Sequence, residues 1–279
     1  MTTGERWLEV GDRVFVRRHA SLDLNCGLVV GEDACLVIDT RQHLGEATDL
    51  IAAIRRVTDR PWTVVNTHAH WDHCFGNAAF RPAPIWTQVR AAADLAASGE
   101  RQRAVAAQQA RDTGRDDLAD QIRSAPIDAP DRLVEEHVEL IVGGRRVNLR
   151  FLGRGHTDGD LVVEVDCGSG SCVIFAGDLV EEGNPPGFDD AYPLDWAATL
   201  GRLHGLVRGP VVPGHGAVVD VEFVGGQRAD MLVIDRLIRE SFHGSGDAAD
   251  VNGPLPAASP YDDETTHLAV RRGWQQLRG

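Results

Sequence analysis

Three histidines and one aspartate fall within six consecutive residues of the segment Thr67-His68-Ala69-His70-Trp71-Asp72-His73. Imidazole nitrogens and carboxylate oxygens are ligands that zinc accepts at about 2.0–2.2 Å. Four such donors in one short turn cannot all reach a single tetrahedral ion, but they can serve two neighbouring ions. The segment therefore predicts metal binding rather than a packing role.

Three further metal-type residues follow, each beside a glycine at the end of an apolar segment. They are His156 in Gly155-His156-Thr157, Asp178 in Ala176-Gly177-Asp178, and His215 in Gly214-His215-Gly216. A neighbouring glycine lets the backbone approach an ion closely. Taken singly, a loop histidine is more often structural than a ligand. Together, these residues complete a donor set large enough for two metal ions.

The segments between the motifs alternate between strand and helix patterns. Strands are predicted at 13–18, 26–30, 34–40, 62–67, 133–142, 147–153, 160–166, 172–178 and 210–214, and helices at 45–58, 194–206, 227–242 and 264–277. Residues 88–125 are rich in Ala, Arg and Gln and predict two or three helices, either a solvated insertion or a lid over the site. Residues 244–260 have the composition of a flexible link.

This pattern predicts an α+β fold in which two sheets pack as a sandwich between helices. The length of 279 residues suits one large domain. We expect residues 1–225 to form the catalytic domain, with 88–125 as its helical insertion. Residues 226–279 are expected to form a C-terminal helical extension of the same domain.

Composition narrows the classes of function. The formal charge is −14, no basic run is present, and every basic residue is arginine. Nucleic acid is therefore not an expected partner, and a lysine nucleophile is excluded. No apolar run approaches the roughly 20 residues of a membrane span, and the N-terminus lacks the apolar core of a signal peptide. Five scattered cysteines favour a reducing compartment. We expect a cytoplasmic protein that acts on a small molecule, without membrane attachment and with no indication of its oligomeric state.

The order of the motifs over residues 39–215 resembles that of the metallo-β-lactamase superfamily. The family pattern is an Asp after an apolar strand, then His-x-His-x-Asp-His, Gly-His, Gly-Asp and Gly-His; Asp39 matches the first position. The resemblance implies a four-layer αββα sandwich with the metals at one edge of the two sheets. It also implies a supporting role for Asp39 and two zinc sites: His68, His70 and His156 for the first, Asp72, His73 and His215 for the second, and Asp178 bridging both.

Two zinc ions about 3.5–4 Å apart can share a hydroxide and lower its pKa toward neutrality. The expected reaction is attack of this bridging hydroxide on a carbonyl polarised by one zinc ion. Asp72 would orient the nucleophile and accept its proton. Tyr192 is a candidate oxyanion donor.

Asn25 and the loop after Asp178 each allow two interpretations. Asn25 would face the metals at the sheet edge or form a turn through a local backbone bond. The 182–194 loop, with Glu182, Asn184 and Phe188, would line the pocket or form an ordinary surface loop. Trp71 is expected to be a packing or pocket-wall residue and Cys74 a buried neutral thiol. Five histidines that match no motif are expected on the surface or on helices: His19, His137, His204, His243 and His267.

The substrate class depends on comparison within the superfamily. Nuclease members carry basic surfaces, flavin-linked di-iron members carry a flavodoxin domain, and persulfide dioxygenase members use a single iron. Glyoxalase II and the β-lactamases are similar in their metal shell, and the stretch from Gly177 to Gly216 resembles bacterial members that act in polyketide thioester hydrolysis and ring closure. We therefore expect hydrolysis of an intracellular thioester, ester or lactone, with β-lactam hydrolysis as the alternative.

Two functions outside hydrolysis remain open. Iron or manganese would also suit the His/Asp donor set, so an iron-dependent redox enzyme on this fold is an alternative. The second alternative is a binding module that has lost catalysis. It predicts lost ligands, whereas this sequence has the full set.

Overall fold

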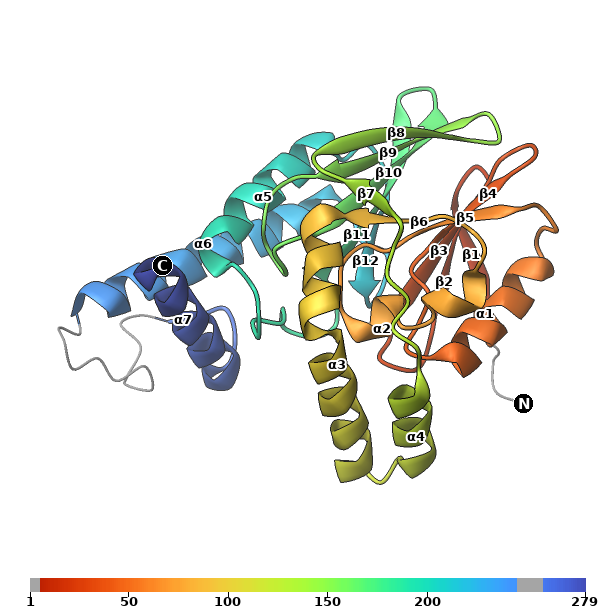
Figure 1. The fold of residues 1–279 in the computed structure, drawn as a ribbon. Helices are drawn as coiled ribbons and strands as arrows, with labels where there is room; N and C mark the ends of the chain where they lie inside the picture. Colours follow the sequence, from red (N-terminus) through yellow and green to blue (C-terminus); the bar gives the residue numbers. More distant parts are fainter. Residues whose placement is uncertain (1–5, 245–257) are drawn as a thin grey trace.

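Strand-forming segments along the chain assemble into two β-sheets that pack face to face in the computed structural model (Figure 1). The structure describes residues 6–244 and 258–279. In the larger sheet, β1 to β4 are antiparallel and β4 to β7 are parallel. Its seven strands, in spatial order, are β1 (Trp7–Gly11), β2 (Val14–Arg18), β3 (Asn25–Val30), β4 (Cys35–Ile38), β5 (Trp62–Val65), β6 (Ile85–Gln88) and β7 (Arg132–Val134).

The second sheet has five strands and also mixes directions. β12 pairs with β11 in parallel, and the remaining neighbours are antiparallel. In spatial order the strands are β12 (Val211–His215), β11 (Ser171–Glu181), β10 (Leu161–Gly168), β9 (Arg145–Phe151) and β8 (His137–Val142).

Helices cover the outer faces of both sheets (Figure 1). α1 packs on the seven-stranded sheet, whereas α5, α6 and α7 pack on the five-stranded sheet. The helices are α1 (Leu44–Arg55), α2 (Trp71–Cys74), the short 3-10 helix η1 (Asn77–Phe80), α3 (Val89–Asp112), α4 (Asp116–Ser124), α5 (Pro193–Leu206), α6 (Val221–Gly244) and α7 (Asp263–Arg278). This arrangement confirms the predicted αββα sandwich.

The layers follow from the alternation of side chains along each strand. In β4, Leu36 and Ile38 point to the other sheet, whereas Cys35 and Val37 point to the α1 side. All four are buried because both faces of this central strand are covered. Continuous apolar runs such as this one are therefore expected in a sandwich covered by helices.

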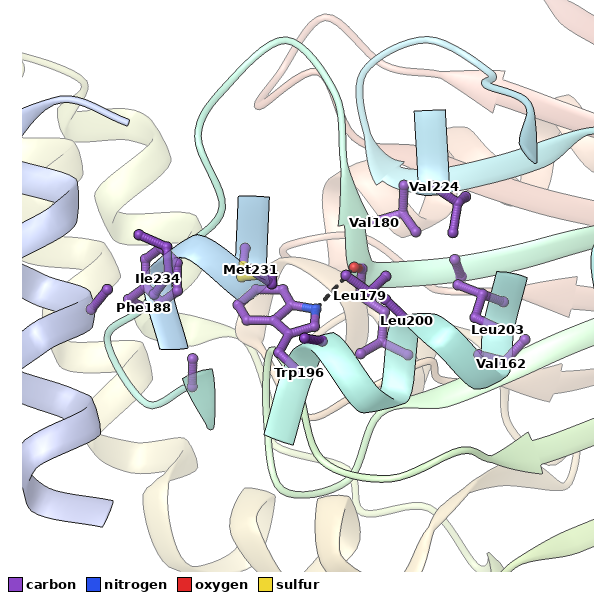
Figure 2. Packing of buried hydrophobic residues seen from close by; sticks show 14 of the residues in the cluster. Val162, Leu179, Val180, Phe188, Trp196, Leu200, Leu203, Val224, Met231 and Ile234 are labelled. Atoms are coloured by element: carbon purple, nitrogen blue, oxygen red, sulfur yellow. Dashed lines mark hydrogen bonds between the residues drawn. The ribbon is translucent and has the colours of Figure 1, made fainter. Parts of the chain in front are cut away.

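Trp196 is one of the two largest fully buried side chains between the five-stranded sheet and its helices (Figure 2). It lies on α5, and its indole N–H donates to the carbonyl oxygen of Leu179 at 3.1 Å. Its ring packs edge-on against Phe188 at a centroid distance of 5.5 Å. Trp196 thus joins α5 to β11 and to the loop that follows β11.

The 88–125 segment forms two helices, α3 and α4, that project together from the sandwich (Figure 1). The prediction of a single strand at 133–142 is wrong. The chain passes there from β7 in one sheet to β8 in the other, turning at Glu135 and Glu136, whose carbonyl oxygens accept from Gln88 and Phe151. An alternating pattern does not reveal such a change of sheet.

The C-terminal part of the chain is helical, as predicted. α6 crosses residue 225, so the expected boundary between domain and extension falls inside one helix and stays a prediction. The expected link at 244–260 lies largely outside the described residues. In the parts of the chain that are described, no helix has the length and apolar character needed to cross a membrane.

Candidate metal centre

The predicted ligands lie where strands end at one edge of the sandwich. His68 and His70 follow β5, and α2 begins immediately after His70. His156 lies in the loop between β9 and β10, while Asp178 lies in β11 and His215 ends β12. Strand ends in α/β sheets are the usual place for ligand sites, because the loops there are free to carry functional side chains.

Two adjacent donor groups result from this arrangement. In each group, the ligand atoms lie within 4.8 Å of one another. The first group consists of His68, His70, His156 and Asp178, and the second of Asp72, His73 and His215. The structure therefore brings together every metal-type residue that the sequence singles out.

Asp178 is the residue that links the two groups. One carboxylate oxygen, Oδ2, lies 3.3 Å from His156 Nε2 and 3.4 Å from His215 Nε2. The other, Oδ1, lies 3.3 Å from His73 Nε2. A Cβ at Gly214 would lie 1.7 Å from Oδ1, so only glycine fits beside this carboxylate. The expectation that glycine permits close approach therefore applies at this position.

An aspartate and a threonine orient two histidines of the motif, His68 and His73. Asp39 accepts from the backbone N–H of Thr67 at 2.8 Å and from its hydroxyl at 2.9 Å, and its Oδ2 lies 2.9 Å from His73 Nδ1. The Thr67 hydroxyl lies 3.1 Å from His68 Nδ1. The Nε2 atoms of both histidines therefore remain directed at the centre, which is how outer-shell partners fix metal ligands.

The His215 loop is fixed by residues near the start of β3. His215 Nδ1 lies 2.8 Å from the carbonyl oxygen of Leu22. The Asn25 amide donates to the carbonyl oxygens of Pro213 and Gly216 at 3.0 and 2.9 Å. The reading of Asn25 as a residue with a local backbone bond is therefore wrong, because its partners lie at the far end of the sequence. Asn25 holds the loop that carries His215.

Two carboxylates contact the remaining histidines, and sequence reasoning missed both. Asp190 accepts from His70 Nε2 at 3.0 Å, and Glu181 Oε1 lies 3.4 Å from His156 Nδ1. Burial and the Asp178 charge raise the pKa of Glu181 to about 8. Carboxylates are common in this chain, so nothing in the local sequence distinguishes these two.

The donor atoms that face the centre fit a metal ion. His70 Nδ1 lies 2.9 Å from His156 Nε2, and His73 Nε2 lies 3.2 Å from His215 Nε2. A neutral imidazole has a single N–H, and in each of these four rings the other nitrogen faces an oxygen atom that can accept it. The two nitrogens of each pair therefore face each other with lone pairs. In addition, His68 Nε2 and Asp178 Oδ1 are buried and have no hydrogen-bond partner among the described residues. Buried polar atoms normally have one, so these residues fit a cation shared between them.

The local electrostatics favour positive charge. Burial opposes protonation of His215, but Asp178 and Asp72 outweigh it and raise its pKa to about 12. The same carboxylates raise the pKa of His73 well above its ordinary value. The pKa of Asp178 is held well below its usual range despite burial, because four histidines surround it. A divalent cation would replace protons at this centre.

A cavity of about 530 Å³ opens onto the donor set between α3 and the loop after β11. Besides the predicted ligands His70, Asp72, His156 and Asp178, it is lined by Trp71, Arg101, Gln102, Val105, Ala106, Gln109, Gly187, Asp189 and Asp190. α3 therefore forms one wall of the site. The interpretation of 88–125 as only a solvated insertion does not account for this position. Trp71 is a wall residue, as predicted.

The 182–194 loop lines the cavity through Gly187, Asp189 and Asp190. The expected lining residues of this loop, Glu182, Asn184 and Phe188, are not among them. Phe188 is buried in the hydrophobic core, and the Glu182 carboxylate accepts from the backbone N–H of Ala217. Tyr192 lines a neighbouring cavity, and the guanidinium groups of Arg154 and Arg272 lie 4.4 and 5.1 Å from the centroid of its ring. The structure does not bring its hydroxyl to the donor set, and its role as oxyanion donor stays a sequence-based prediction.

Residues that match no motif mostly have the expected exposure. Cys74 is buried and its pKa is raised well above the ordinary value by burial, in agreement with a neutral thiol. His137 and His204 are exposed, and the side chain of His243 lies outside the described residues. His19 is fully buried, so its expected surface position is wrong.

The family model described as the metallo-β-lactamase superfamily matches residues 22–215, which include every predicted ligand. This chain belongs to that superfamily. Members of this superfamily are metal-dependent hydrolases, and the chain has a hydrolase fold with residues able to bind metal at the expected edge. A search of curated protein sequences gave no match.

Solved structures show the same fold at low sequence identity. A metallo-β-lactamase from Pontibacter korlensis is 18% identical with a TM-score of 0.63, over 82% of this chain and 99% of that one. The DIM-1 metallo-β-lactamase is 16% identical with a TM-score of 0.61, over 82% and 97%. A variant of the sec-alkyl sulfatase PisA1 is 14% identical with a TM-score of 0.76, over 99% of this chain and 50% of that chain. These likenesses establish the fold and leave the substrate open.

Proposed function

We propose that this protein is a dinuclear zinc hydrolase that cleaves a carbonyl substrate, with Asp178 as the ligand shared by both ions. The observation that carries the proposal is the position of Asp178, whose two carboxylate oxygens each face histidines of the second group while Oδ2 also faces His156 of the first. Zinc accepts this combination of imidazole and carboxylate donors.

Two zinc ions would supply an activated water and polarise the substrate carbonyl. The chain supplies the rest. Asp72 lines the cavity, and its Oδ2 lies 3.3 Å from His215 Nε2. Burial opposes ionisation of Asp72, but His73 and His215 outweigh it and lower its pKa to about 2. Its carboxylate is therefore ionised, so that Oδ2 is able to accept a hydrogen bond from the attacking water and orient it.

Thioesters, esters and lactones are the substrates we favour, because the cavity has polar and apolar walls and opens directly onto Asp72. The second candidate is a β-lactam, which is supported by the structural likeness to proteins named as metallo-β-lactamases. The test is elemental analysis of the purified chain together with assays on a thioester, a lactone, a chromogenic cephalosporin and an alkyl sulfate ester.

About two zinc ions per chain and turnover of a thioester, ester or lactone would support the favoured assignment. Turnover of the cephalosporin alone would select the second candidate. One iron per chain with oxygen consumption and no hydrolysis would instead place the protein among redox enzymes and refute the proposal.

Narrowing the cavity from the α3 side is expected to impair substrate binding without removing metal. Val105 lines the cavity and is 50% exposed, so Val105→Trp adds volume there without disturbing the core. We expect kcat/KM to fall at least about tenfold, since the added ring competes with substrate for space. The measurement is steady-state kinetics with parallel metal analysis.

Ala104→Trp is the matched control, because Ala104 is exposed on the same helix but does not line the cavity. It should leave kcat/KM within about twofold. If Val105→Trp also retained the original kcat/KM, the substrate would not contact this wall of the cavity.

A further inference from the structure

Among the five histidines of the donor set, His70 is the one that presents Nδ1 to the centre and has a carboxylate on Nε2. Its Nε2 lies 3.0 and 3.2 Å from the two oxygens of Asp190, while its Nδ1 lies 2.9 Å from His156 Nε2. The hydrogen bond to Asp190 therefore keeps the proton on Nε2 and leaves the Nδ1 lone pair for a metal.

Asp190 lies in the loop after β11, and this loop is held from the C-terminal side of the chain. The guanidinium of Arg272 on α7 donates to the carbonyl oxygens of Ala191 and Asp190 at 2.6 and 3.0 Å. Two successive carbonyl groups are thus fixed by one planar side chain, which constrains the direction of the loop backbone.

A second residue of α7 fixes the loop where it enters α5. Gln276 accepts from the backbone N–H of Leu194 at 3.2 Å and donates to Asp195 at 3.0 Å. α7 is itself anchored in the core by Trp274, which is 2% exposed. The position of Asp190 therefore depends on a helix that lies well beyond the family match, which ends at residue 215.

We infer that Asp190 is a positioning residue for the metal centre, orienting His70 toward the metal, and that α7 maintains it through Arg272. This inference rests on the proposed metal function. It adds that metal affinity at the first site depends on the C-terminal helix, through a continuous path from Arg272 to the loop backbone, the Asp190 carboxylate and the His70 ring.

The test is metal binding by Asp190→Asn in the full-length protein. Metal-stripped protein is titrated with Co²⁺, which is followed by its visible absorption, and Zn²⁺ affinity is measured by competition with a chelator. We expect one binding step to weaken by about 10–100-fold, the usual effect of losing such an outer-shell carboxylate. The other step should change by less than about threefold. Circular dichroism and the melting temperature of the metal-free protein show whether the variant is folded.

Asp189→Asn is the matched control, because Asp189 lies next in the same loop and lines the same cavity. We expect it to keep wild-type metal affinity. Arg272→Gln leaves the Asp190 carboxylate in place but removes the guanidinium from the loop, so it should weaken the same binding step by a smaller factor. It also provides an independent measurement if Asp190→Asn does not fold.

Wild-type affinity for both ions in Asp190→Asn would overturn the inference while leaving the dinuclear function intact. Weakening of both steps to the same extent in the Asp189→Asn control would also overturn it, because the effect would then be one of general charge in the cavity. A wild-type chain that binds a single ion would refute the dinuclear function alone, since Asp190→Asn would still lower the affinity for that ion.

Discussion

Replacement of Asp178 by alanine is expected to remove metal from both groups and to abolish turnover. Asp178 is the proposed shared donor, because its oxygens lie 3.3–3.4 Å from ring nitrogens of both groups. Its loss leaves three donors in each group and takes away the charge that offsets two divalent ions. We expect less than one ion per chain after dialysis and a fall in kcat of at least about 10³-fold. Elemental analysis and kinetics on the best substrate measure these quantities.

Asp189→Ala is the control for metal content, because it removes a carboxylate from the same cavity without touching the donor set. It should retain the metal content of the wild type. An Asp178→Ala variant that retained two ions per chain would show that Asp178 does not bridge, and the assignment of shared ligands would have to be revised.

Replacement of Trp196 by alanine is expected to lower the free energy of unfolding by about 3–5 kcal/mol. The side chain is fully buried, and its removal leaves a cavity between α5 and β11 (Figure 2). The ring also packs edge-on against His156 at a centroid distance of 5.8 Å. Urea unfolding of the metal-free protein is the measurement, because bound metal would add its own contribution to stability.

Two further variants separate the causes of this effect. Trp196→Phe keeps most of the packing and loses the indole N–H, but the carbonyl oxygen of Leu179 retains a second donor in Gln227. Its cost should stay below about 1.5 kcal/mol. Leu232→Ala, at a half-exposed position of α6, should change stability by less than about 0.5 kcal/mol. An equal loss in Trp196→Ala and Leu232→Ala would contradict the central role of Trp196 in this core.

The metal-type residues could be predicted from the sequence because their chemistry is rare and concentrated. His68, His70 and His73 fall in one turn, and few structural needs produce such a run. The αββα fold was also predictable, since buried strands such as β4 are apolar on both faces. These features depend on residue type and on short-range spacing, which a sequence displays directly.

The supporting residues could not be predicted, because their roles arise from contacts between distant parts of the chain. Asp190 is 120 residues from His70, and Asn25 is 188 residues from Pro213. An aspartate or asparagine in a loop has many alternative roles, and only the fold selects one of them. The change of sheet within 133–142 was missed for a similar reason: both sheets accept the same alternation of side chains.

The metal centre takes its donors from both halves of the sandwich. The residues from His68 to His73 follow a strand of the seven-stranded sheet, whereas His156, Asp178 and His215 come from the five-stranded sheet. No disulfide joins the described cysteines. An ion bound here would therefore act as a cross-link between the two halves, much as a disulfide does in an exported protein. Loss of metal would remove this cross-link at the edge where the cavity opens, so catalysis and part of the cohesion between the two halves would depend on the same bonds.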